Sequence, residues 1–146
     1  MATDSATDGN PVTCDANTEA DPDFVEHYGC LYSWEDALKV YPKGWHLPSQ
    51  AEFEALLNFA SNDAATSSKN LRAESFADGK DLYGFSALPA GHGEEQTYNN
   101  IKTNTYFWTN TVLSDTSAYY LTIDENAAKI LTNTKTYAYS VRCLKD

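Results

Sequence analysis

The sequence predicts an α+β domain in which two short helices precede a run of antiparallel strands. Two observations support this prediction. Between residues 33 and 60, apolar residues recur at helical spacing behind residues that favour helix starts. From residue 105 onward, short aromatic and β-branched stretches alternate with polar turns. The chain has 146 residues, 42% of them hydrophobic, which suits one domain with a single core.

Residues 1–27 are expected to form an acidic, irregular arm, and residues 28–146 the folded domain. The arm holds acidic residues and no Lys or Arg. Its acids lack the spacing of an EF-hand calcium loop, so it is interpreted as a solvated tail. Residues 1–10 show no export signal, which fits both a mature exported domain and a cytosolic protein.

The net charge of −11 would repel phosphate backbones, so nucleic acid is not expected as a partner. No apolar run approaches the roughly 18 residues that a membrane helix needs, so we expect no membrane insertion by this chain.

Two helices are predicted after a short extended stretch at 27–32. In SWEDALKV, Ser33 is placed as the N-cap residue, and Pro42 and Gly44 end the helix. In GWHLPSQAEFEALL, Ser49 and Glu52 match a capping box. This second helix should end near residues 61–63, and its apolar face comprises Phe53, Leu56, Leu57 and Ala60.

His46, inside GWHLPS, is predicted to be a structural or surface residue. Trp45 and Leu47 flank it in alternation, so it should point away from the face that they bury.

The rest of the chain reads as loops and strands. Residues 61–70 are a polar stretch, 81–93 a strand flanked by turns, and 94–104 a polar loop. A series of antiparallel hairpins then follows, with strands at 105–113, 118–125, 127–133 and 137–144.

Three cysteines are present, Cys14, Cys30 and Cys143, without a CxxC pair or a His/Cys cluster, so no structural zinc site is predicted. One disulfide with one free thiol, or three free thiols, both fit the sequence, which does not choose the pairing.

Several fragments, in this order and spacing, resemble the Fibrobacter succinogenes major paralogous domain family, which is abundant on the surface of Bacteroidetes and Fibrobacter cells. The resemblance covers about residues 28 to 146. The fragments are YGCLYSWEDAL, GWHLPSQAEFEALL, DLYGFSALPAG, YFWTNT, AYYLTI and YSVRCLKD.

The resemblance implies a C-type-lectin-like fold, distantly similar to that of formylglycine-generating enzyme. Two helices would flank a small antiparallel sheet with long loops, and the last strand would return beside the first. Members commonly carry a Cys where this chain has Tyr41, and they lack one at Cys30. The resemblance therefore makes Cys30–Cys143 a candidate replacement bridge, with Cys14–Cys30 as its competitor. The family's usual N-terminal W-x-x-E-N-L-like signature is absent.

Catalysis is not expected. The histidines are His27, His46 and His92, and none stands in a known hydrolase or metalloprotease motif. The HGEE stretch at 92–95 is read as a solvated loop, and no active-site cysteine pair carries over from the formylglycine-generating relatives.

Binding is the expected function, because Tyr and Trp interleaved with Asn and Thr supply aromatic platforms and adaptable hydrogen bonds, a mixture that sugars require. Phe107 and Trp108 are adjacent, as are Tyr119 and Tyr120, so one of each pair should face outward. The predicted ligand-binding residues are Tyr98, Asn99, Asn100, Tyr106, Trp108, Asn110 and Asp115.

The sequence thus predicts a non-catalytic, extracellular or cell-surface domain that binds a glycan. The alternative is a protein-binding, adhesin or scaffold domain, and the resemblance adds a diversified binding face. No cofactor or metal is assigned. Lectin analogy keeps calcium as a candidate, although the EPN and WND signatures are absent.

Overall fold

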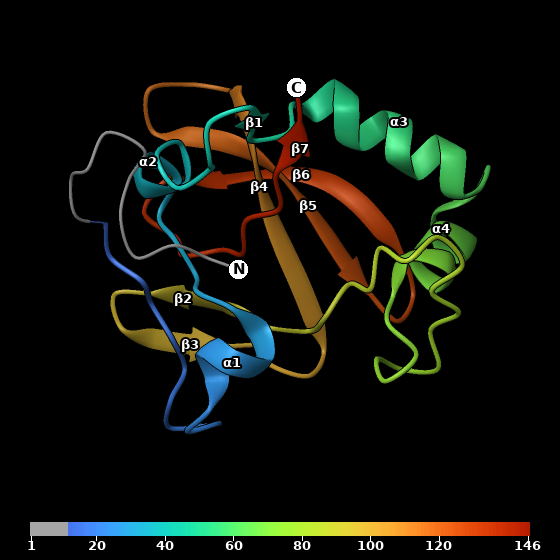
Figure 1. Cartoon of the computed structure of the whole chain (residues 1–146), viewed down its shortest axis with the longest axis horizontal. Helices are drawn as coiled ribbons and strands as arrows, with labels where there is room; N and C mark the ends of the chain where they lie inside the picture. The colour runs from blue at the N-terminus through green and yellow to red at the C-terminus, as the bar shows by residue number, and fades with distance from the viewer. Residues whose placement is uncertain (1–11) are drawn as a thin grey trace.

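A computed structural model describes residues 12–146 of the chain (Figure 1). Its strands form three small antiparallel sheets, and four helices accompany them. The helices are α1 (Phe24–Tyr28), α2 (Trp34–Ala37), α3 (Gln50–Ala60) and α4 (Ala64–Leu71). The strands are β1 (Trp45–His46), β2 (His92–Glu94), β3 (Thr97–Asn99), β4 (Asn104–Val112), β5 (Ser117–Asp124), β6 (Ala128–Thr134) and β7 (Leu144–Lys145).

The central sheet has the strand order β4-β5-β6, which confirms the first three strands of the predicted run of hairpins. The fourth strand, predicted at 137–144, is wrong, because residues 138–140 form only isolated bridges and β7 pairs with β1. The early strand β1 pairs antiparallel with the last strand, β7, through Trp45 opposite Lys145 and His46 opposite Leu144. The predicted return of the last strand beside the first is therefore present. Helices and small antiparallel sheets together confirm the α+β class.

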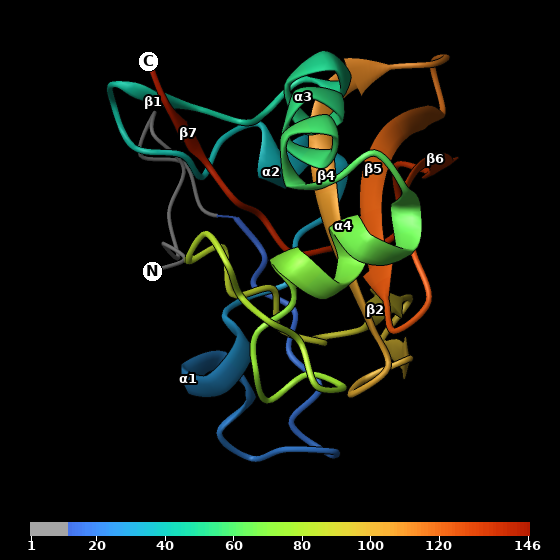
Figure 2. The ribbon, with the colours of Figure 1, turned by 90° about the vertical axis from the view of Figure 1, so that its right-hand side faces the viewer.

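One face of the central sheet, here called the helix-covered face, packs against α3 and α4 (Figure 2). Phe107 and Leu121 are cross-strand neighbours on this face and are 3% and 0% exposed. Phe53 of α3 contacts them in the same core cluster. Alternation along the strands dictates this arrangement, because every second side chain points to the same face.

The opposite face, here called the tyrosine face, carries Tyr106, Trp108 and Tyr120. The segment around Tyr32 and the segment around Tyr139 cover it, and both of these residues are buried. Both faces of the sheet are therefore part of the core. We expected one residue of each adjacent aromatic pair to face outward, and this prediction is wrong for Phe107 and Trp108, which are both buried.

Both predicted helix starts are confirmed. The Ser33 hydroxyl accepts a hydrogen bond from the backbone N–H of Asp36 at the start of α2. Ser49 and Glu52 form the full capping box of α3, with each side chain accepting from the other residue's backbone N–H. These caps satisfy N–H groups that the first helical turn leaves free.

The predicted boundary at residue 27 differs from the structure. Residues 1–11 of the predicted arm lie outside the described residues, but residues 12–27 pack against the domain. Asp15 pairs with Leu31 in an antiparallel bridge, and Phe24 of α1 is fully buried. Apolar contact and backbone pairing thus extend the folded unit toward the N-terminus.

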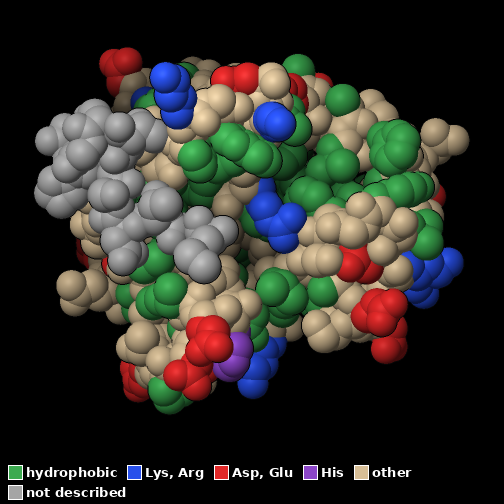
Figure 3. Space-filling model, in the orientation of Figure 1, with side chains coloured by type: hydrophobic (Ala, Val, Ile, Leu, Met, Phe, Trp, Pro, Cys, Tyr) green, Lys and Arg blue, Asp and Glu red, His purple; other side chains and the backbone are tan. Residues whose placement is uncertain are grey.

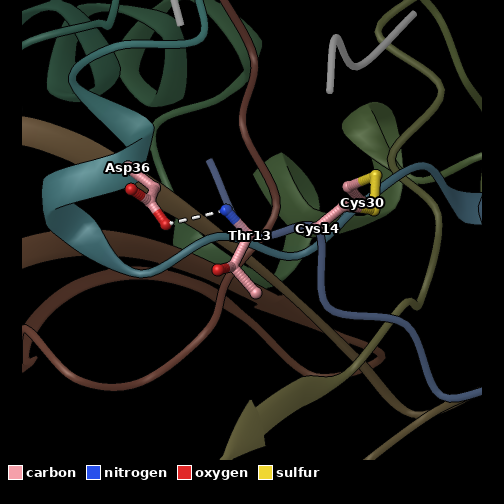
Figure 4. Close-up of a disulfide and its surroundings, with 4 residues drawn as sticks. All are labelled: Thr13, Cys14, Cys30 and Asp36. Carbon is pink, nitrogen blue, oxygen red and sulfur yellow. Dashed lines mark hydrogen bonds between the residues drawn. A yellow bond between two sulfur atoms is a disulfide. The ribbon is translucent and has the colours of Figure 1, made fainter. Parts of the chain in front are cut away.

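A disulfide joins Cys14 to Cys30, and Cys143 is a free thiol (Figure 4). The bridge suggested from the family resemblance, Cys30–Cys143, is therefore wrong, and its competitor is correct. Beside the disulfide, the backbone N–H of Thr13 donates to the Asp36 carboxylate at 3.1 Å. These contacts hold residues 13–15 against α2 and the chain just before it.

Helix α4 lies in the stretch predicted as a polar loop. Its two serines donate to backbone carbonyls outside the helix, the Ser67 hydroxyl to Leu57 O and the Ser68 hydroxyl to Asp124 O. Asp63 caps its start by accepting from Thr66 N. A helix with so few apolar residues is therefore attached to the core by hydrogen bonds that its composition does not reveal.

Residues 81–93, predicted as a strand, are mostly irregular, and the hairpin β2–β3 falls partly in the predicted loop. Gly91 stands at the base of this hairpin with φ +70°, and a Cβ there would lie 2.3 Å from Asn99 O. Only glycine permits both the backbone conformation and this close approach.

Candidate functional site

The tyrosine face supports an aromatic cluster with polar atoms at its edge. Tyr139 lies across the sheet, stacked on Tyr106 with ring centroids 5.0 Å apart and an interplanar angle of 14°. Its ring also lies 4.8 Å from that of Tyr120 and 4.4 Å from that of Trp108. Burial raises the pKa of the Tyr139 hydroxyl, so this group stays protonated and acts as a neutral hydrogen-bonding partner.

His92 of β2 closes one side of this cluster. Its ring centroid lies 5.1 Å from Tyr106 and 5.5 Å from Tyr137. Its Nδ1 atom is buried and has no hydrogen-bond partner among the described residues. Burial lowers the pKa of His92, which favours the neutral imidazole. We call His92, Tyr106, Tyr120, Tyr137 and Tyr139 the tyrosine–histidine cluster.

Amide and carboxylate groups form the rim of the cluster. The side-chain nitrogen of Asn100 donates to the Tyr106 hydroxyl at 2.8 Å, and that of Asn133 donates to the Tyr139 hydroxyl at 2.8 Å. The Glu94 carboxylate, which is exposed on β2, raises the pKa of the Tyr137 hydroxyl. Rings and hydrogen-bonding groups therefore lie along one face of the sheet, an arrangement suited to a ligand with an apolar face and several hydroxyls.

The structure brings together two of the predicted ligand-binding residues, Asn100 and Tyr106, through their hydrogen bond. Asn99 is exposed and lies opposite His92 in the β2–β3 register, so it stands next to the cluster. Tyr98 is half-buried and packs onto a smaller core cluster that contains Phe24.

Trp108 is not available to a ligand. It is 0% exposed, and its indole N–H donates to the carbonyl of Tyr32 at 2.9 Å. The prediction of an exposed Trp108 platform is therefore wrong, because residues 28–34 cover the face on which it lies.

The last two predicted residues lie away from the cluster. Asn110 is exposed, and its side-chain N–H donates to Leu47 O at 2.9 Å, so it links β4 to the chain before α3. Asp115 is exposed in the β4–β5 turn, where its carbonyl accepts from Lys135 Nζ at 3.0 Å.

His92, Tyr137, Tyr139 and Asn133 were missed from the sequence. One signal was present for two of them, since Tyr137 and Tyr139 alternate in YAYS as in a strand with one aromatic face. His92 joins the cluster because it lies in the hairpin β2–β3. The polar composition of β3 does not indicate a strand, so the sequence did not predict this hairpin.

His46 forms a separate polar site at the start of α3. Its Nδ1 lies 2.7 Å from Asp146 Oδ1, and its Nε2 lies 3.0 Å from Glu52 Oε2. Both carboxylates raise the pKa of His46. The surface role predicted for this residue agrees with these contacts, but Trp45 is 41% exposed whereas Leu47 is buried, so Trp45 does not share the buried face of Leu47.

In the part of the chain that the structure describes, no three His, Cys, Asp or Glu side chains are grouped so that they could hold a metal ion. None of the helices over residues 12–146 is both long and apolar enough to span a bilayer.

Together, the fold and this site define a small, disulfide-linked α+β domain with an aromatic–amide face. The sequence model of the Fibrobacter succinogenes major domain matches residues 2–145, so the chain belongs to this family. No curated protein and no solved structure matches the chain.

Proposed function

We propose that this chain is a non-catalytic, extracellular domain that binds polysaccharide at the rim of the tyrosine–histidine cluster. At this rim Tyr137, Asn100 and Asn133 reach solvent, whereas the rings of Tyr106, Tyr120 and Tyr139 are buried. The observation that supports it most is the convergence of aromatic rings with the amides of Asn100 and Asn133, each bonded to a tyrosine hydroxyl. A partly exposed ring such as that of Tyr137 can bind the C–H face of a sugar, and the amides and hydroxyls of the rim can bind its hydroxyl groups.

The buried Nδ1 of His92 adds to this proposal. A buried polar atom without a partner costs free energy, and a ligand hydroxyl or an ordered water would supply the missing hydrogen bond. The neutral imidazole can serve as donor or acceptor according to its tautomer.

The extracellular location and the finer fold assignment belong to the same proposal. The Cys14–Cys30 disulfide is consistent with an oxidising compartment. The pairing of β1 with β7 is what a C-type-lectin-like fold would require, since its last strand returns beside its first.

Affinity gel electrophoresis on plant and bacterial polysaccharides tests the proposal. We expect the wild type to be retarded and Tyr137→Ala to bind roughly tenfold more weakly. The matched control is Tyr83→Ala, because Tyr83 is 47% exposed and lies outside the cluster. Parallel gels with EDTA test calcium. Absence of retardation throughout the panel, or equal losses in both variants, would contradict the proposal.

A protein-binding or adhesin role is the second candidate, and one surface favours it. Phe59, Leu82 and Tyr83 are 69%, 56% and 47% exposed, and the rings of Phe59 and Tyr83 lie 4.8 Å apart. Contiguous exposed apolar side chains mark many protein contact sites. A Phe59→Ser variant that loses cell or protein adhesion while it keeps polysaccharide retardation would support this role.

A further inference from the structure

A cleft of about 850 Å³ lies apart from the tyrosine–histidine cluster, between α1, β1 and residues 140–143. Figure 3 shows this face of the molecule hollowed near its centre, with hydrophobic side chains around the hollow and a basic side chain at its edge. The cleft volume is in the range of small-molecule sites. None of the five cluster residues lines the cleft, so it is a second, independent site.

Apolar side chains line the cleft and remain in contact with solvent. Trp45 and Val25 are 41% and 46% exposed, whereas the other two tryptophans, Trp34 and Trp108, are buried. Tyr28 of α1 lies in the same lining. An apolar ligand would remove this surface from water, which is the main favourable term in binding.

Arg142 supplies a positive charge on the wall of this apolar cleft. Its guanidinium lies over the rings of Phe85 and Phe107 and donates to the carbonyls of Phe85 and Ser86. These two bonds use two of its five N–H groups. Among the described residues, the guanidinium of Arg142 forms no ion pair with a carboxylate within 4.0 Å. The three ion pairs found in this part of the chain all involve histidine.

The acids near this charge form no ion pair with it among the described residues. Burial lowers the pKa of Arg142, and the Asp81 carboxylate opposes this shift through space but is itself bonded to the backbone N–H and hydroxyl of Ser86. Glu26, the acid among the described residues of the lining, is exposed on α1. A cation on a partly buried wall is best compensated by an anion that forms hydrogen bonds with it.

We propose that this cleft binds a small apolar monocarboxylate, with the carboxylate on Arg142 and the apolar body against Trp45, Tyr28 and Val25. A flat, delocalised guanidinium matches the two oxygens of a carboxylate. An aliphatic acid and an aromatic acid both have this chemistry. Testing one acid of each kind shows which of them the cleft binds.

Two readouts place a ligand in the cleft of the 146-residue protein. Trp45 is the exposed tryptophan, so its fluorescence should change on binding. Cys143 lines the cleft and is the free cysteine, so an occupied cleft should slow its alkylation by iodoacetamide. The bonded pair Cys14–Cys30 does not react, so mass spectrometry follows a single thiol.

The first test compares octanoate with 1-octanol, and 3-phenylpropionate with 3-phenylpropan-1-ol, on the wild type. We expect saturable fluorescence change and Cys143 protection with at least one acid, and about tenfold weaker binding of the matching alcohol. Equal binding of acid and alcohol would overturn the role of Arg142. Absence of both signals with both acids would overturn the site.

Variants check the location without relying on Arg142, whose contacts to residues 85 and 86 make it important for folding. Val25→Trp should fill the cleft mouth and abolish binding of whichever acid the wild type binds, and the exposed position of Val25 should leave the fold intact. Arg142→Lys should retain binding at reduced affinity. Unchanged binding by Val25→Trp would contradict the proposal, and Tyr83→Ala, outside the cleft, is the control.

Discussion

The two faces of the central sheet are built from alternate residues of the same three strands, yet they differ in chemistry. The helix-covered face carries Phe107, Leu121 and Ile123, which are buried and apolar under α3 and α4. The tyrosine face carries Tyr106 and Tyr120, whose rings are buried but whose hydroxyls belong to a polar network. One face therefore packs mainly apolar side chains, whereas the other combines core packing with hydrogen-bonding hydroxyls.

The largest expected effect tests the helix-covered face. Leu121 is fully buried, so Leu121→Ala removes apolar contacts and leaves a cavity. We expect the free energy of unfolding to fall by about 3–5 kcal/mol, measured by urea denaturation. The control is Leu131→Ala on β6, opposite Tyr120 on the tyrosine face and 45% exposed, for which we expect a loss of less than about 1 kcal/mol. Equal losses would refute the distinction between the faces.

A covalent link stabilises only the layer over the tyrosine face. Cys30 belongs to the core cluster of that face, and its bond to Cys14 spans 16 residues. Reduction should lower the free energy of unfolding by about 3 kcal/mol, since the reduced unfolded chain regains loop entropy. Urea unfolding with and without a reductant measures the effect.

The control for the disulfide is Cys143→Ser, which should keep the full sensitivity to reductant because Cys143 is free. Peptide mapping under non-reducing conditions provides a direct check. A peptide that joins Cys30 to Cys143 would contradict the pairing described here.

The same comparison explains how much of the fold could be predicted. Caps and helical spacing are local signals, and Ser33, Ser49 and Glu52 formed the contacts that the sequence indicates. The strands after residue 105 could also be predicted from their alternating pattern, because each strand pairs with the next one in the sequence.

Features that depend on distant partners were not predictable in this way. Trp108 is buried because the chain near Tyr32, 76 positions earlier, covers it. Helix α4 depends on backbone carbonyls of other elements, such as Asp124 O, that accept from its serines. The tyrosine–histidine cluster joins His92 to tyrosines of three later segments. Of the seven predicted site residues, Asn100 and Tyr106 belong to the cluster or its rim and Asn99 adjoins it, whereas Trp108 is buried and the others, Tyr98, Asn110 and Asp115, lie elsewhere.

The smallest expected effect contrasts two histidines with opposite environments. Bonds to Glu52 and Asp146 raise the pKa of His46, so its stabilising contribution is present below about pH 6.5 and is lost as the pH rises through the folded-state pKa. Burial lowers the pKa of His92, so its folded state is favoured above about pH 6.5 and loses stability as the pH falls toward the lowered pKa.

Urea unfolding of the wild type, His46→Gln and His92→Gln from pH 5 to 8 separates these two effects. The wild type should gain stability relative to His46→Gln as the pH falls, because a protonated His46 binds both carboxylates. Relative to His92→Gln, it should instead lose stability as the pH falls, because the unfolded chain takes up a proton that the buried imidazole resists. If both differences were independent of pH, neither histidine would titrate differently in the folded and unfolded chains. If both moved in the same direction, the contrast between the exposed His46 site and the tyrosine–histidine cluster would be wrong.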